Sequence, residues 1–150
     1  RGGVPFRMYK VRTMRKGTPS VGSHEVPSGV TSKIGQLLRR LKIDELPQIW
    51  NVLLGEMSFV GPRPCLPTQS EVIRERTRRN CFRVRPGITG AAQVAKVDMS
   101  DPEQLAYLDA MMIENLSIRS YIGFILKTAT GGGQGDAAVR REEHSQRHAA

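Results

Sequence analysis

Apolar residues recur along most of the chain at the spacing of a helix face. In the segment that follows Asp44, apolar side chains stand at i, i+3, i+4 and i+7, at Leu46, Ile49, Trp50 and Leu53. An earlier segment that starts at Thr31 or Ser32 has the same spacing, at Ile34, Leu37, Leu38 and Leu41. Further helices are predicted over residues 68–79, from Asp101-Pro102 onward, and over residues 118–130.

Two segments predict strands instead. Residues 4–14 (VPFRMYKVRTM) alternate between apolar and basic side chains, and residues 91–97 (AAQVAKV) form a short strand-like run after a turn. Residues 15–31 are rich in Gly, Ser, Pro and Thr, which indicates a loop that could order over a substrate. The fold class expected from these patterns is α+β and predominantly helical, with short amphipathic helices and a small β element.

The start of the helix after Lys42 carries two acidic residues. Asp44 is expected to be the N-cap, Pro47 fits the first turn, and Gly55 is expected to end the helix. The dipole at such a position favours an ionised carboxylate and also attracts phosphate. An Asp-Glu pair is equally an ordinary way to begin a helix, so this pattern alone does not establish a site.

Two arginines stand in short segments stiffened by proline and turned by glycine. Arg63 lies in Gly61-Pro62-Arg63-Pro64, and Arg85 lies in the VRPGITG run at 84–90. A guanidinium group on a rigid turn loses little entropy on binding and can contact phosphate in a bidentate manner. These segments favour a site for a diphosphate.

The composition indicates that a binding partner is negatively charged but does not identify it. The formal net charge is +9 and the isoelectric point is about 10.3, which implies nucleic acid, anionic lipid headgroups or a phosphorylated substrate. No window approaches the roughly 18 consecutive apolar residues that a membrane span needs. Cys65 and Cys81 are expected to be reduced thiols in or near the core.

Several motifs in order carry a resemblance to a known family. PFRMYKVRTM at 5–14, the run from Lys33 to Pro64 that contains KIDELPQ and GPRP, VRPGITGAAQV at 84–94 and GGGQGD at 131–136 resemble the bacterial sugar transferases. These are monotopic polyprenyl-phosphate phosphoglycosyl transferases. Family members carry a hydrophobic membrane helix before the segment that matches Tyr9-Lys10, and this chain starts just before that segment. We therefore expect a catalytic domain over residues 1–136 that lacks this helix, and a polar tail over 137–150.

The resemblance implies a reaction, a location and a set of site residues. The expected reaction transfers a sugar 1-phosphate from a UDP-sugar to undecaprenyl phosphate and releases UMP, at an anionic membrane surface on the cytoplasmic face of the inner membrane. Asp44 would attack the phosphorus next to the sugar and form a phospho-aspartate. Glu45, together with Asp44, would hold Mg²⁺. The expected phosphate contacts are Arg63, Arg85, Lys10 and Arg39; for Arg39 a solvated helix face is an equal alternative.

Two other classes of function fit the charge. One is a basic nucleic-acid-binding domain, although aromatic residues for base stacking are only 5% of the chain and no zinc-finger or RNP-type motif occurs. The other is a peripheral membrane domain without catalysis. The ordered motifs favour the transferase, which implies no nucleic-acid partner.

Overall fold

The computed structural model describes residues 1–14 and 31–130. The loop predicted before Thr31, the GGGQGD segment and the tail predicted over 137–150 lie outside these residues, apart from Thr31 itself. The elements, in chain order, are α1 (Lys33–Arg40), a 3₁₀ turn (Ile43–Glu45), α2 (Gln48–Leu53), β1 (Ser58–Val60), α3 (Ser70–Arg78), a second 3₁₀ turn (Cys81–Arg83), β2 (Gly87–Thr89), α4 (Ala91–Val94), α5 (Pro102–Glu114) and α6 (Ile118–Ala129). The predicted class, α+β and predominantly helical, is confirmed.

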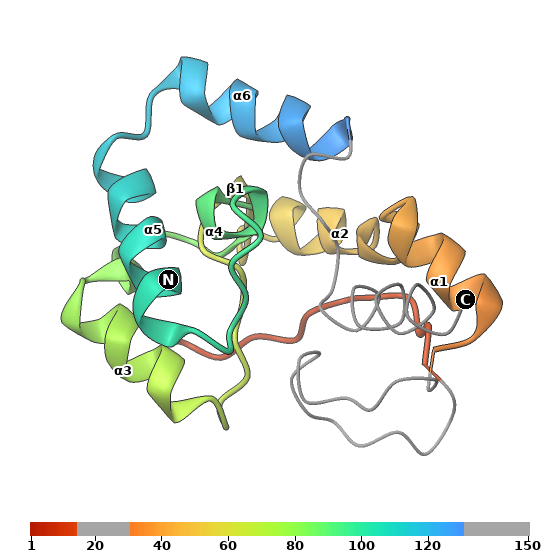
Figure 1. Ribbon diagram of the computed structural model, residues 1–150, viewed down its shortest axis with the longest axis horizontal. Coiled ribbons are helices and arrows are strands. Elements are labelled where there is room, and N and C mark those ends of the chain that lie inside the picture. The colour runs from red at the N-terminus through yellow and green to blue at the C-terminus, as the bar shows by residue number, and fades with distance from the viewer. Residues whose placement is uncertain (15–30, 131–150) are drawn as a thin grey trace, which may run out of the picture.

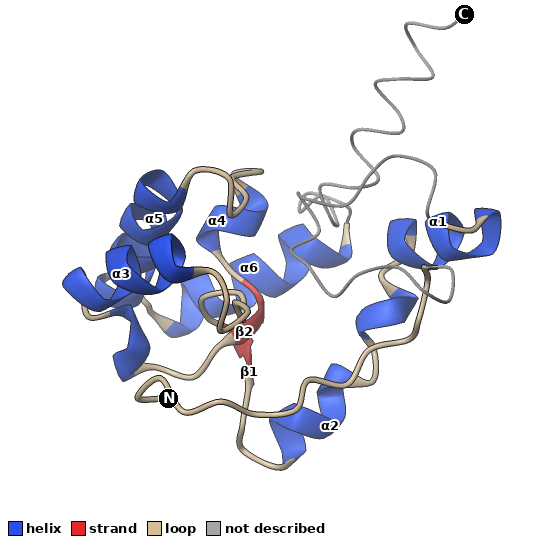
Figure 2. Ribbon diagram, turned by 90° about the horizontal axis from the view of Figure 1, so that it is seen from below, coloured by secondary structure: helices blue, strands red, loops and turns tan. Residues whose placement is uncertain are grey.

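The two short strands form the centre of the molecule. They pair in parallel, with Ser58 opposite Gly87 and Val60 opposite Thr89. Helices α3, α4 and α5 lie on one side of this pair and α1 and α2 on the other, while α6 crosses over the strands (Figures 1 and 2). The two motif segments that contain Arg63 and Arg85 each adjoin one of the paired strands.

Glycines allow these two segments to approach closely. A Cβ atom added to Gly87 would lie 2.1 Å from the backbone nitrogen of Gly61, and one added to Gly61 would lie 2.5 Å from the carbonyl oxygen of Arg85. Gly87 also donates its N–H to the carbonyl of Pro62, at 2.9 Å. No side chain fits at this contact, so the glycines of both motifs are required by the packing.

The apolar core lies on the α3–α5 side. Val72, Ala92 and Leu105 are buried together, with Cys65 among the half-buried residues packed around them. Cys65 and Cys81 are both free thiols, as predicted, and burial raises the pKa of the Cys81 thiol to about 11. Cys81 therefore stays protonated at neutral pH.

The prediction of a strand over residues 4–14 is wrong. The only bridge in the described part of this segment joins Met14 to Thr31, and no described strand pairs with the rest. The extended chain is held by a helix instead: Asn51 accepts from the Tyr9 N–H at 3.0 Å and donates to the Arg7 carbonyl at 2.8 Å. Apolar and basic side chains do alternate along this segment. At Arg7 and Tyr9, however, its backbone is hydrogen-bonded to the buried side-chain amide of Asn51 and not to a neighbouring strand.

The predicted helix from Asp44 to Leu54 is divided. Asp44 and Glu45 lie in the 3₁₀ turn, and α2 begins only at Gln48, with Pro47 as its N-cap residue. Asp44 is thus not the N-cap of α2, because Lys42 adopts a left-handed conformation (φ 56°) and the chain turns there before the helix starts. The end was predicted correctly, since Gly55 has φ 76° directly after Leu54.

The apolar stripes of α1 and α2 point away from the core. Leu53 is 71% exposed, and α2 buries Gln48 and Asn51 instead. In α1 the buried residues are Gly35 and Arg39. The exposed apolar residues on and beside these two helices are Ile34, Leu37, Leu41, Leu46, Ile49, Trp50 and Leu54. Helical periodicity located the apolar faces but does not report which face packs inward.

Of the remaining helices, α1, α3, α5 and α6 were predicted and α4 was not. Ser32 caps α1, Asp101 caps α5 by accepting from the Gln104 N–H, and α3 and α6 lie within a few residues of their predicted ranges. The strand predicted over 91–97 is wrong: residues 91–94 form α4, which packs on α5 and ends before Lys96 at φ 61°. Across the described ranges, every helix is too short or too polar to cross a bilayer.

Candidate active site

Two neighbouring carboxylates and two cations meet beside the turn between α1 and α2. Lys10 Nζ lies 3.1 Å from Asp44 Oδ2 and 3.6 Å from Glu45 Oε1. Arg63 Nη2 donates to Glu45 Oε1 at 2.8 Å. These four residues come from three separate parts of the sequence, and all four were predicted as site residues.

The 3₁₀ turn fixes the position of Asp44. The left-handed Lys42 accepts from the Glu45 N–H at 3.2 Å, and the carbonyl of Asp44 accepts from the Val11 N–H at 2.9 Å. Asp44 is only 2% exposed. The backbone of Asp44 is thus fixed by the turn and by Val11, and its carboxylate faces the Lys10 ammonium.

The segment that carries Lys10 is held in place by Asn51. This side chain is completely buried and makes three hydrogen bonds, to the Tyr9 N–H, to the Arg7 carbonyl and to Glu56 Oε2 at 2.7 Å. Arg7 and Tyr9 lie shortly before the site lysine in the sequence, so Asn51 sets where Lys10 lies. Sequence patterns missed Asn51, since a polar residue within an apolar helix pattern is normally placed on the solvent face.

Arg39 is buried and does not lie on a solvated helix face. It is 5% exposed, and its Nε donates to Thr13 Oγ1 at 2.8 Å. Thr13 lies three residues after Lys10, so α1 and the extended segment are joined next to the site. The alternative of a solvated face for this arginine is wrong, because α1 turns its apolar residues outward.

Arg85 lies apart from the four-residue cluster. Its backbone is close to Gly61, but its guanidinium lies beside Gly55, at the opposite end of α2 from Asp44 and Glu45. There it lines a cavity of about 380 Å³ together with Ser58, Arg83 and Tyr121. The structure brings Arg63 to the carboxylates and directs Arg85 elsewhere, so a role for Arg85 at the same phosphate stays a prediction.

Lys42 is a further cation that the sequence patterns did not single out. Its Nζ donates to the carbonyl of Thr128 in α6 at 3.4 Å. Burial lowers the pKa of Lys42, with Glu45 opposing this effect and Arg63 adding to it. Lys42 therefore shares its electrostatic surroundings with the site, and the last turn of α6 reaches it.

The donor set at Asp44 and Glu45 suits a divalent cation that is shared with phosphate. The two carboxylates converge on one ammonium group, which shows that they can face the same ion. Mg²⁺ commonly takes one or two carboxylates, with phosphate oxygens and water as the other ligands. Across residues 1–14 and 31–130, no group of three or more His, Cys, Asp or Glu side chains forms a closed metal site.

The surroundings carry more positive than negative charge. Lys10, Lys42 and Arg63 lie around the two carboxylates. A phosphate group that enters this site meets fixed cations, which offset its repulsion from the carboxylates.

Comparison with known proteins shows the family of the chain. The family model described as "Bacterial sugar transferase" matches residues 1–133. The chain belongs to the bacterial sugar transferase family, as its motifs predicted.

Several curated proteins are similar to the chain. It is 41% identical to the uncharacterized sugar transferase EpsL of Bacillus subtilis over 115 residues, which are 77% of this chain and 56% of that protein. It is 41% identical over 97 residues to a UDP-glucose:undecaprenyl-phosphate glucose-1-phosphate transferase of Caulobacter vibrioides, covering 62% and 36%. It is 35% identical over 135 residues to a UDP-N-acetylgalactosamine-undecaprenyl-phosphate N-acetylgalactosaminephosphotransferase of Aeromonas hydrophila, covering 85% and 32%. The chain spans about half or less of the length of these relatives.

Proposed function

We propose that this chain is the catalytic domain of an enzyme that transfers a sugar 1-phosphate from a UDP-sugar to undecaprenyl phosphate and releases UMP. The observation that carries the proposal is the buried Asp44 beside Glu45, with Lys10 and Arg63 held against the pair. The names of the Caulobacter and Aeromonas relatives support a UDP-sugar donor and an undecaprenyl-phosphate acceptor.

The proposed reaction has two displacements at one phosphorus atom. In the first, a carboxylate oxygen of Asp44 bonds to the phosphorus that bears the sugar, and the bond from this phosphorus to the bridging oxygen breaks. UMP leaves with that oxygen. In the second, an oxygen of undecaprenyl phosphate bonds to the same phosphorus, the bond to Asp44 breaks, and the carboxylate is restored. The lipid product carries a diphosphate and the sugar.

The neighbouring residues have separate tasks in this scheme. Lys10 orients the Asp44 carboxylate, and its ammonium also neutralises an incoming phosphate. Arg63 fixes Glu45 through Nη2, and in this scheme its guanidinium also contacts the diphosphate. Glu45 and Asp44 would hold Mg²⁺, which when bound offsets negative charge on the diphosphate and on the departing UMP.

A panel of UDP-sugars tests the proposal. We expect the membrane-reconstituted protein to release UMP from one or a few members of the panel. Release beyond one UMP per protein molecule should require undecaprenyl phosphate, because the first displacement alone releases a single UMP. The organic phase should contain a lipid whose mass exceeds that of the acceptor by one phosphosugar. A panel that covers the common UDP-hexoses and N-acetylhexosamines and gives no such lipid would refute the proposal.

We propose in addition that the exposed apolar faces of α1, α2 and α6 contact the membrane surface. Leu53 on α2 is strongly exposed, as are Ile118, Ile122 and Leu126 on α6. Exposed apolar stripes beside basic residues suit the headgroup boundary of an anionic bilayer. Such contact would keep the site at the depth where a lipid-linked phosphate is found.

Leu53→Glu should weaken this contact several-fold, because a charge replaces an apolar group at the bilayer boundary. The measurement is the fraction of protein that floats with liposomes containing anionic lipid. Tyr107→Glu on α5 is the matched control, since Tyr107 is also exposed and apolar but lies on another helix. Equal losses from both substitutions would show that charge, and not the α2 face, sets the binding.

A further inference from the structure

A buried ion pair lies behind the site, between α3 and α5. Arg76 on α3 donates from Nε and Nη2 to Asp109 Oδ2 on α5, at 2.9 and 2.7 Å. Both residues are only 1% exposed. Neither residue belongs to the cluster around Asp44.

The third nitrogen of this guanidinium binds outside the ion pair. Arg76 Nη1 donates to the carbonyl oxygen of Arg63 at 2.7 Å. Arg63 is the residue whose guanidinium contacts Glu45 at 2.8 Å. A continuous series of contacts therefore runs from Asp109 through Arg76 and Arg63 to the carboxylates.

A contribution to folding stability does not by itself explain this ion pair. Burying two charges costs desolvation energy, and an apolar pair of the same size often serves an interface at least as well. Burial raises the pKa of Asp109, with the Arg76 guanidinium opposing this effect. Asp109 Oδ1 has no hydrogen-bond partner within the described ranges. Val72 and Leu105 already supply apolar packing on α3 and α5.

What an arginine adds at this position is its planar set of donors. Two nitrogens of the guanidinium bind the Asp109 carboxylate, while the third donates to the backbone carbonyl of Arg63. Prolines on both sides of Arg63 restrict its local dihedral angles but do not place the segment relative to the helices. The bond from Arg76 supplies this placement.

We propose that Arg76, held by Asp109, is a positioning residue that fixes the backbone of Arg63 so that its guanidinium meets Glu45 and the substrate phosphate. This inference rests on the proposed function, in which Arg63 acts at the diphosphate. Arg76 does not touch the reacting atoms. Its effect on turnover passes through the side chain of Arg63.

A double-mutant cycle tests this dependence. Arg76→Lys keeps the charge but has one nitrogen, which cannot bind Asp109 and the Arg63 carbonyl in the same way. We expect the single variant to lose about 10- to 100-fold in turnover, since a small displacement of a phosphate-binding group has effects of this size. Arg63→Ala alone should lose about 100-fold or more. The double variant should be no slower than Arg63→Ala, because the group that Arg76 positions is already gone.

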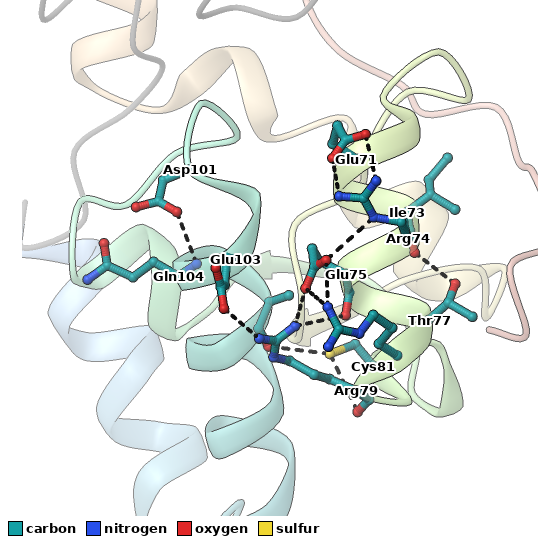
Figure 3. Close-up of polar contacts among 12 residues, drawn as sticks. Glu71, Ile73, Arg74, Glu75, Thr77, Arg79, Cys81, Asp101, Glu103 and Gln104 are labelled. Atoms are coloured by element: carbon teal, nitrogen blue, oxygen red, sulfur yellow. Dashed lines mark hydrogen bonds and ion pairs between the residues drawn. The ribbon is translucent and has the colours of Figure 1, made fainter.

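The controls separate positioning from folding. Arg74→Lys alters an exposed pair with Glu71 on the same helix (Figure 3) and should stay within about twofold of the original turnover. Asp109→Asn is a second way to release Arg76, and it should also give no further loss in the Arg63→Ala background. Turnover is measured as UMP release below the unfolding temperature of each variant, which circular dichroism establishes.

Each outcome decides a different claim. Losses that multiply in the double variants, or normal turnover in a folded Arg76→Lys variant, would overturn the positioning role and leave the proposed function intact. Normal turnover in Arg63→Ala would overturn the role of Arg63 itself, and the inference with it. A protein that releases no UMP with any UDP-sugar would refute the proposed function before the cycle is reached.

Discussion

Asp44→Asn is expected to abolish UMP release, with a loss of at least about a thousandfold. The amide has nearly the same shape as the carboxylate but cannot form the acyl phosphate. Asp44 is buried against Lys10, so water is poorly placed to replace it as the nucleophile. Steady-state UMP release with undecaprenyl phosphate and the preferred UDP-sugar measures the effect.

The proposed covalent intermediate provides a second test of Asp44. When the acceptor lipid is left out, the protein should gain the mass of one phosphosugar, and peptide mapping should place it on Asp44. Asp101→Asn is a matched control, because Asp101 is an exposed helix cap whose role asparagine also fills. It should keep normal turnover and still form the adduct. An active Asp44→Asn variant, or an adduct on another residue, would remove the nucleophile from this position.

Removal of divalent metal should lower turnover by about a hundredfold or more, and added Mg²⁺ should restore it. The reason is electrostatic: a carboxylate that approaches a diphosphate meets like charge, and the cations seen around Asp44 also have carboxylates to neutralise. The measurement is UMP release after EDTA treatment, followed by titration with Mg²⁺.

The Glu45→Gln variant tests whether Glu45 is a ligand of the metal. We expect this variant to need about tenfold or more Mg²⁺ for half-maximal turnover, since one anionic ligand is lost. Glu45 also binds Arg63, so Arg63→Ala is tested beside it; that variant should lose turnover without shifting the Mg²⁺ requirement. Glu103→Gln, at an exposed glutamate of α5, is the neutral control. Full turnover in EDTA would contradict the role given to the metal and to Glu45.

The helices were largely predictable because their signals are local. Ser32 and Asp101 cap α1 and α5 as their side chains predict, and Gly55 ends α2 in the conformation that glycine favours. The orientation of the helices was not predictable in this way. Periodicity gives an apolar face, and only the tertiary structure shows that α2 buries Asn51 and exposes Leu53.

The site was predictable as far as motifs mark it. Lys10, Asp44, Glu45 and Arg63 were expected together and lie together, although their chemical roles stay predictions. Arg85 could not be placed, because the direction of a guanidinium depends on contacts outside its own turn. Asn51 and Arg76 were missed for the same reason: their bonds to Arg7 and Asp109 join residues 44 and 33 positions apart.

In the proposed reaction the sugar leaves the nucleotide together with the phosphate that bears it. A UDP-sugar labelled with ³²P at the phosphate next to the sugar tests this directly, in the presence of undecaprenyl phosphate. We expect the label to move into the organic phase with the lipid, the nucleotide product to be unlabelled UMP, and Asp44→Asn to stop the transfer. Label that stays in the aqueous phase as UDP, while the sugar enters the lipid, would show simple glycosyl transfer and would refute the proposed phosphosugar transfer.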